Sequence, residues 1–204
     1  MNTVEIIGHV GTYARAVRMA CEEKGVPYSV TRALPQTPEV QALHPFGKIP
    51  ILRHDGFVLC ESKAIVSYLD HLSPERPLIP TEPIAAALTE QWISLVNDVV
   101  DQTMIRDYVL SYVRARIEER PPNRTTIDAT LPAIEKQLAV LDGAVATTGY
   151  LAGDQLTFAD LNLMAILSSI REYPEGRAAL ERWPRLLGYF LRHAERESFR
   201  KTAN

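Results

Sequence analysis

The 204-residue chain is long enough for one large domain or two small ones, each with its own hydrophobic core. Its composition, 46% hydrophobic and 23% charged, is that of a soluble globular protein, and the net charge of -3 without a basic block argues against a nucleic-acid partner. The longest strongly apolar stretch, residues 158–170, is too short to span a bilayer core of about 30 Å, so no membrane partner is expected. The N-terminus also lacks the pattern of a signal peptide.

The two cysteines predict neither a disulfide framework nor a metal site. Cys21 and Cys60 form no CxxC motif and no set with metal-ligand spacing. Cys21 lies on the apolar face of a predicted helix, which favours a buried structural side chain. Two unpaired cysteines fit a reducing compartment, so we expect a cytoplasmic protein without a bound metal.

Strand-like and helix-like runs alternate in the first part of the chain. The periodicity predicts strands at residues 4–7, 27–31, 49–53 and 57–59, and helices at residues 13–24, 38–43 and 62–72. The first strand, helix and strand form a βαβ unit, which implies two parallel strands. Asp55-Gly56 between the last two strands predicts an antiparallel hairpin. We therefore expect a small mixed four-stranded sheet with helices on both faces.

The second part of the chain reads as helical throughout. A proline-dense segment, residues 73–80, separates it from the first part. Helices are expected at residues 84–116, 126–147, 158–171 and 185–197, with proline and glycine breakers between them. Residues 158–170 are apolar nearly all round, which places that helix at the centre of a bundle, and Thr157 with Asp160 predicts a capping box at its start. We assign residues 1–78 to the first domain, 79–83 to a linker and 84–204 to the helical domain.

Four segments, in order along almost the whole chain, resemble the cytosolic-type glutathione transferase family in its bacterial form. They are RAVRMACEEKGVPY (15–28), HPFGKIPIL (44–52), LCESKAIVSYL (59–69) and LTFADL (156–161). The resemblance implies an α/β thioredoxin-like N-terminal domain that binds glutathione, followed by an all-α C-terminal domain that forms the pocket for an electrophile. It also implies a detoxification enzyme that acts as a homodimer and needs no cofactor, because glutathione is its co-substrate.

The resemblance assigns Ile49-Pro50 to the cysteinyl part of glutathione. An X-Pro bond is cis in only about 5–6% of cases, but family members hold this proline cis, and we expect the same here. A cis bond turns the backbone N–H and C=O of Ile49 outward, where they can pair with the ligand backbone as an added strand does. The alternative is an ordinary trans proline at the start of a strand.

Glu61-Ser62 lies where a predicted strand gives way to a helix. Helix N-termini carry unpaired N–H groups that bind carboxylates. We therefore expect Ser62 to hold the α-carboxylate of the γ-glutamyl group and Glu61 to contribute to its ammonium; the alternative is Ser62 as a simple N-cap. Lys48 is expected near the glycyl end or the cysteinyl carbonyl, and Gln36 is a weak substitute for the family's glycyl ligand. His44 replaces the asparagine that the family commonly has, which leaves its role open.

The group that activates the thiol is ambiguous in this sequence. Family members place a hydroxyl or thiol near the end of the first strand or the start of the first helix, but His9-Val10-Gly11-Thr12-Tyr13 departs from each class pattern. Different alignments place the catalytic residue at Gly11, Thr12 or Tyr13. We rank Thr12 first because a short hydroxyl suits a helix start, Tyr13 close behind it because it is the better acid, and His9 third.

The predicted electrophile pocket uses the first helix of the second domain, with Arg106, Tyr108 and Tyr112 as its candidate lining. The function expected from these residues is activation of glutathione for attack on small hydrophobic electrophiles, or for reduction of peroxides or disulfides. The alternative is a non-catalytic module of the same fold that serves as an interaction scaffold. An intact Glu61-Ser62 motif favours retained glutathione binding, while the ambiguous thiol-activating group keeps the alternative open.

Overall fold

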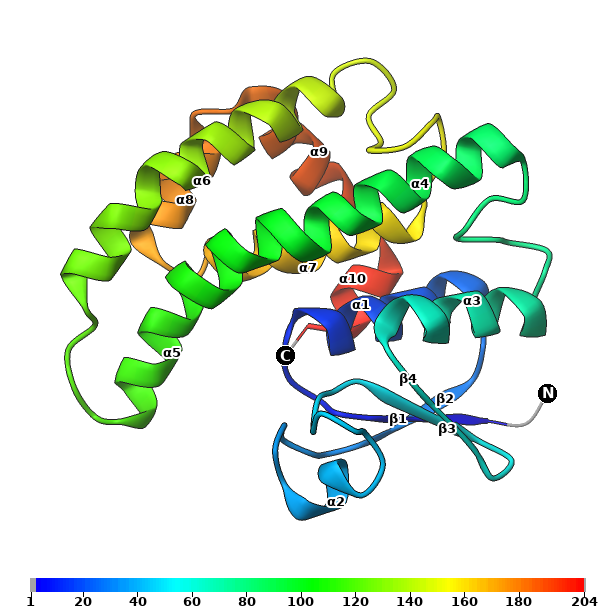
Figure 1. Ribbon diagram of the computed structural model, residues 1–204. Coiled ribbons are helices and arrows are strands. Elements are labelled where there is room, and N and C mark those ends of the chain that lie inside the picture. Colours follow the sequence, from blue (N-terminus) through cyan, green and yellow to red (C-terminus); the bar gives the residue numbers. More distant parts are fainter. Residues whose placement is uncertain (1–2, 204) are drawn as a thin grey trace.

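The computed structural model describes residues 3–203, in which a small sheet domain lies beside a larger array of helices (Figure 1). The sheet domain contains β1 (Val4–Ile7), α1 (Thr12–Lys24), β2 (Tyr28–Thr31), α2 (Pro38–Gln41), β3 (Ile51–His54), β4 (Phe57–Cys60) and α3 (Ser62–Leu72). This order and type of elements confirms the predicted thioredoxin-like half. The first strand and the last helix have the predicted bounds, and the other elements differ by one to two residues at an end.

The sheet has the strand order β2-β1-β3-β4. β1 and β2 are parallel, and β3 is antiparallel to both β1 and β4. The mixed four-stranded sheet predicted from the sequence is therefore confirmed. Helices α1 and α3 cover one face of the sheet, and α2 lies on the opposite side (Figure 1). β3 begins at Ile51 rather than at Ile49, because Pro50 has no N–H to give to the sheet.

Helix α1 is the buried centre of this domain. Its apolar face includes Ala16, Val17 and Cys21, all with no exposed surface. Gly25 ends the helix in the left-handed conformation, and its N–H bonds back to the carbonyls of Cys21 and Glu22. Burial raises the pKa of the Cys21 thiol to about 12, so this side chain is an inert core residue, as predicted.

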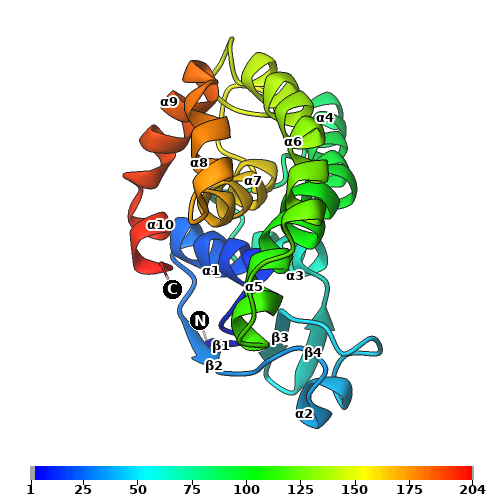
Figure 2. The same cartoon turned by 90° about the vertical axis from the view of Figure 1, so that its left-hand side faces the viewer.

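The helical domain packs around one apolar helix. Its elements are α4 (Pro83–Leu95), η1 (Val96–Val100), η2 (Gln102–Val109), α5 (Leu110–Ile117), α6 (Arg124–Ala144), α7 (Phe158–Ile170), α8 (Pro174–Glu181), α9 (Pro184–Ala194) and α10 (Glu197–Lys201). Helix α7 is buried along nearly its whole length and lies between the other helices and α1 (Figure 2). The predicted capping box is present, and Asp160 accepts from the Thr157 N–H at 2.9 Å.

Two predictions about the last third of the chain were wrong. No helix was expected between residues 171 and 185, but α8 lies there and begins at Pro174, where the missing N–H of proline has no intrahelical partner to lose. The single helix expected over residues 185–197 is two helices, α9 and α10, which are separated at Glu195 and Arg196. Nothing between residues 3 and 203 forms a helix long and apolar enough to cross a membrane.

The long helix predicted over residues 84–116 is continuous but not uniform. Its centre, η1 and η2, is π-helical, with wider turns than an α-helix. Wider turns bring residues five apart together, and Arg106 accordingly bonds to Asp101 at 2.9 Å. A π-turn also frees backbone carbonyls, and the Asn97 carbonyl accepts from the Tyr13 hydroxyl at 3.4 Å. The π-helical segment therefore makes direct contact with the start of α1.

The connection between the domains is held against the sheet domain. The buried Lys24 ammonium lies 2.7 Å from Asp70 and donates to the carbonyls of Ser73 and Arg76. The Asp70 carboxylate in turn accepts from the N–H groups of Leu78 and Ile79. These contacts hold residues 73–79 between α3 and α4, so most of the proline-dense segment is anchored to the sheet domain.

Candidate functional site

Strand register brings three chain segments to one end of the sheet. Ile51 of β3 lies opposite Ile7 of β1 and opposite Cys60 of β4. The residues that follow β1, precede β3 and follow β4 therefore meet at the same end, where the chain also enters α1 and α3 (Figure 1). Gly8 makes this convergence possible, because a Cβ at that position would lie 2.7 Å from the Cβ of Ile49.

The Ile49-Pro50 peptide bond is cis, as predicted. Among the bonds formed by residues 3–203, none uses the N–H or the C=O of Ile49, although both neighbouring strands are fully paired. Unpaired backbone groups at a strand end can accept another extended backbone. The segment before β3 can therefore bind a short peptide-like ligand in a strand-like manner.

The start of α3 lies next to this segment and carries unpaired hydrogen-bond donors. Ser62 is the first helical residue and is only 7% exposed, and its hydroxyl has no hydrogen bond within the described chain. The helix is preceded by Glu61, which has a φ of 71°, an unusual conformation for a residue with a side chain. Because the N-cap position belongs to Glu61, Ser62 is not an N-cap. Its hydroxyl and the unpaired N–H groups of the first turn remain available to a carboxylate.

Two other predicted glutathione ligands have different surroundings. Lys48 is exposed and makes no ion pair within residues 3–203. Gln36 also lies at the surface, but its side-chain amide donates to the Phe46 carbonyl at 2.9 Å and its backbone N–H bonds to the Gly47 carbonyl. Gln36 thus holds the loop around α2, whereas the Lys48 ammonium is free to meet a ligand.

The candidate thiol-activating residues lie at the start of α1, but they are not equivalent. Thr12 is the first helical residue, is 8% exposed, and has no hydrogen bond to its hydroxyl within the described chain. The Tyr13 hydroxyl donates to the Asn97 carbonyl. Burial and the nearby charge of Asp101 raise the pKa of Tyr13 above its ordinary value, so its phenol stays protonated.

His9, ranked third from the sequence, lies in the loop between β1 and α1, where its backbone carbonyl accepts from Arg18 of α1. It lines a pocket of about 330 Å³ with Glu5, Ile7 and residues around α2. His9 lies beyond the end of β1, after Gly8, whose φ of 113° interrupts the extended strand.

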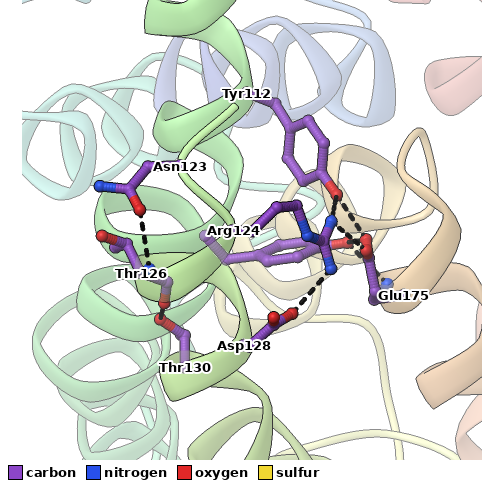
Figure 3. Close-up of polar contacts among 9 residues, drawn as sticks. Tyr112, Asn123, Arg124, Thr126, Asp128, Thr130 and Glu175 are labelled. Atoms are coloured by element: carbon purple, nitrogen blue, oxygen red, sulfur yellow. Dashed lines mark hydrogen bonds and ion pairs between the residues drawn. The ribbon is translucent and has the colours of Figure 1, made fainter. Parts of the chain in front are cut away.

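The three residues predicted to line the electrophile pocket separate in the structure. Arg106 points toward the start of α1, where its charge acts on Tyr13. Tyr108 is completely buried, and its hydroxyl bonds to Glu175 and to the N–H of Gly176, so it is a core residue rather than part of a pocket wall. The Tyr112 hydroxyl donates to Glu175 at 2.6 Å and accepts from Arg124 (Figure 3). Tyr112 therefore belongs to the same helix-joining network.

One residue near the site was missed from the sequence, and the role of a second was left open. Asp101 is buried and sits between Tyr13 and Arg106. The Asp101–Arg106 pair was hidden because residues five apart do not share a face of an α-helix, and only the π-helical turns bring them together. The second is His44, whose ring lies between the loop before β3 and Glu61.

Comparison with known proteins agrees with this geometry. The family model for the glutathione S-transferase N-terminal domain matches residues 9–77, and that for the C-terminal domain matches residues 100–197. Glutathione S-transferase 3 of Zea mays is 30% identical over 203 residues, which cover 91% of this chain and 86% of the relative.

Solved structures of the same kind share the fold. Glutathione transferase F7 from Populus trichocarpa superimposes with a TM-score of 0.89 at 23% identity, over 98% of this chain and 97% of that one. A maize glutathione S-transferase I in complex with an atrazine glutathione conjugate superimposes with a TM-score of 0.87 at 22% identity. The match covers 98% of this chain and 96% of that one. All three relatives are plant proteins, so they lend no support to the bacterial form that we expected. The matched domains and relatives show that the chain belongs to the glutathione S-transferase family.

Proposed function

We propose that the protein binds glutathione at the convergent end of the sheet and activates its thiol. The observation that carries this proposal is the cis Ile49-Pro50 bond with two unpaired backbone groups, next to the free N-terminus of α3. The activated thiol attacks small hydrophobic electrophiles, or serves in the reduction of peroxides or disulfides. Glutathione is the co-substrate in this proposal, and no cofactor is part of it.

Each part of glutathione has a counterpart at this end of the sheet. The cysteinyl backbone pairs with the N–H and C=O of Ile49. The α-carboxylate accepts from Ser62 and the first-turn N–H groups of α3, and the Glu61 carboxylate receives the ammonium. The exposed Lys48 receives the glycyl carboxylate. This arrangement leaves the thiol between β3 and the start of α1.

Thr12 is the residue that we assign to thiol activation. Its hydroxyl is unpartnered and nine-tenths buried at a helix N-terminus, where both the hydroxyl and the backbone N–H groups favour a thiolate. The thiol proton leaves to solvent, and the sulfur forms the new bond as the leaving group departs with its electron pair. Tyr13 is a poorer candidate, because its single proton is directed at the Asn97 carbonyl and a thiolate beside Asp101 is opposed by that charge.

The electrophile is expected on the side of η1 and η2 that faces α1. Arg106 is the predicted lining residue that still fits this place, because its side chain is exposed and is held by Asp101 at the same end of the molecule as Tyr13. A small hydrophobic electrophile bound there would lie between the two domains. Substitution of Arg106 is expected to change which electrophiles the protein accepts and to leave glutathione binding intact.

A homodimer is part of the proposal, and apolar side chains on the surface support it. Four exposed residues along α4 and η1 follow helical spacing, and two exposed phenylalanines lie in the sheet domain: Ile84, Leu88, Leu95, Val99, Phe46 and Phe57. Exposed apolar side chains in such a row are typical of a protein interface. We also place the protein in the cytoplasm, because Cys21 and Cys60 are free thiols in the described chain.

Retention on glutathione-agarose, followed by thiolate absorbance of the eluted complex, tests the proposal. Wild type is expected to bind and to show thiolate. Thr12→Ala is expected to bind without thiolate, Tyr13→Phe to keep both, and Ser62→Ala to lose retention. Ser67→Ala, on the same helix α3, is the matched control. A wild type that is not retained contradicts glutathione binding, and a wild type that binds without thiolate favours the non-catalytic scaffold.

A further inference from the structure

His44 joins two parts of the proposed glutathione site. The residue lies in the turn before β3, where its ring is almost completely buried. Its Nδ1 accepts the Phe46 N–H at 3.0 Å, and its Nε2 lies 3.5 Å from the Oε1 atom of Glu61. The ring thus spans from the loop that carries Ile49 to the residue that precedes α3.

The Phe46 contact determines how the imidazole is protonated toward Glu61. A nitrogen that accepts an N–H bond carries a lone pair, so the proton of a neutral ring resides on the other nitrogen. The proton of the neutral ring is therefore on Nε2, the nitrogen that lies 3.5 Å from the Oε1 atom of Glu61. This polar contact involves one carboxylate oxygen and leaves the other without a partner in the described chain.

Glu61 needs such a restraint because its side chain is otherwise unsupported. Its side chain is 71% exposed, and among residues 3–203 His44 is its only polar partner. An exposed glutamate samples many rotamers and loses that freedom when it binds a ligand. The buried His44 ring can reduce this cost by holding the carboxylate over the start of α3 before the ligand arrives.

We propose that His44 is a positioning residue for the γ-glutamyl ammonium, acting through Glu61. This inference rests on the proposed glutathione site and adds a residue to it. His44 itself does not touch the ligand. Its loss therefore weakens glutathione binding and raises KM for glutathione, with little change in kcat at saturating glutathione.

The variant His44→Asn separates this role from a structural one. An asparagine two residues before Phe46 can still accept that N–H in an Asx-turn, but it is too short to reach Glu61. We expect His44→Asn to keep the thermal midpoint of wild type while weakening glutathione binding by about three- to ten-fold. His44→Ala, which also removes the acceptor for Phe46, serves as the comparison for the turn.

Calorimetric titration with two ligands tests the proposal: glutathione, and glutaryl-cysteinylglycine, which lacks only the α-ammonium. The expected result is that His44→Asn weakens glutathione binding but not the binding of glutaryl-cysteinylglycine, and has no further effect in a Glu61→Gln background. Equal weakening of both ligands, or a full effect in the Glu61→Gln background, overturns the role through Glu61. If wild type binds glutathione and His44→Asn binds it equally well, this inference fails alone. If wild type does not bind glutathione, the proposed function fails and this inference fails with it.

Discussion

The network around Glu175 offers a quantitative test of what holds the helical domain together. Its carboxylate accepts from Arg124 at 2.6 Å and from Tyr112 at 2.6 Å (Figure 3). It also accepts from Tyr108 at 3.1 Å. These four residues come from four different helical segments, η2, α5, α6 and α8. The carboxylate therefore ties the far end of the long interrupted helix to two others. Glu175→Gln keeps the size of the side chain and removes its charge.

The cost of this substitution can be worked from the pKa of Glu175. Burial alone would raise that pKa, but the hydrogen bonds from Tyr112 and Arg124 outweigh it and lower the pKa from 4.5 to about 2. A shift of this size corresponds to ~3 kcal/mol of stability at neutral pH. Because the side chain remains 20% exposed, solvent screens part of it. We expect a loss of ~2 kcal/mol, which lowers the thermal midpoint by about 4–8 °C for a chain of this size.

The loss of stability caused by Glu175→Gln should depend on pH. A carboxylate whose pKa is lowered by folding contributes stability that is complete above its unfolded pKa and is lost as the pH falls through its folded pKa. The difference between wild type and Glu175→Gln should therefore be full at about pH 7 and clearly smaller at about pH 3.5. Thermal unfolding followed by circular dichroism at both pH values measures it.

Glu181→Gln is the matched control for this test. Glu181 lies on the same helix, is exposed, and makes no hydrogen bond or ion pair within residues 3–203. Its substitution should shift the thermal midpoint by no more than the usual surface effect of about 0.5 kcal/mol. The reasoning is refuted if Glu175→Gln behaves like this control, or if its effect is the same at both pH values.

Three further substitutions test other parts of the structure. Thr12→Ala should lower kcat/KM for conjugation on the order of a hundred-fold while glutathione affinity stays within a few-fold, as measured by steady-state kinetics and calorimetry; unchanged kcat/KM would exclude Thr12 as the activating group. Lys24→Met leaves the partly buried Asp70 without its ion pair and should cost ~3 kcal/mol in urea unfolding, and a loss below about 1 kcal/mol would show that the linker anchor is dispensable. Leu88→Glu should convert a dimer into a monomer in analytical ultracentrifugation, and an unaltered sedimentation coefficient would place any interface elsewhere.

Local patterns were sufficient for most of the sheet domain. Strand β1, the end of helix α1 and the mixed sheet were predicted because short strands, a glycine C-cap and an Asp-Gly turn are properties of neighbouring residues. The cis Ile49-Pro50 bond was predicted through a family resemblance, since the residues alone would have favoured trans. Capping by Asp160 was also visible locally, because both partners lie within four residues.

The helical domain was predicted less well, for a different reason. A proline such as Pro174 can end one helix or begin the next, and the neighbouring residues did not distinguish these two cases. The π-helical turns of η1 and η2 had no recognisable signal, so the Asp101–Arg106 pair and the core position of Tyr108 were missed. The prediction assumed the period of an α-helix for this segment, whereas η1 and η2 have the wider turns of a π-helix.

The sequence by itself determined which groups the protein can offer: an Ile49-Pro50 pair before a strand, a Glu61-Ser62 helix start, and hydroxyls near the start of α1. Each depends on residues that are adjacent in the chain, and adjacency is what a sequence records. Only the tertiary structure shows that the Tyr13 hydroxyl donates to the Asn97 carbonyl, 84 residues away, and this contact is why our proposal favours Thr12. It likewise brought His44 to Glu61, since that contact depends on how a turn and a helix start meet in space.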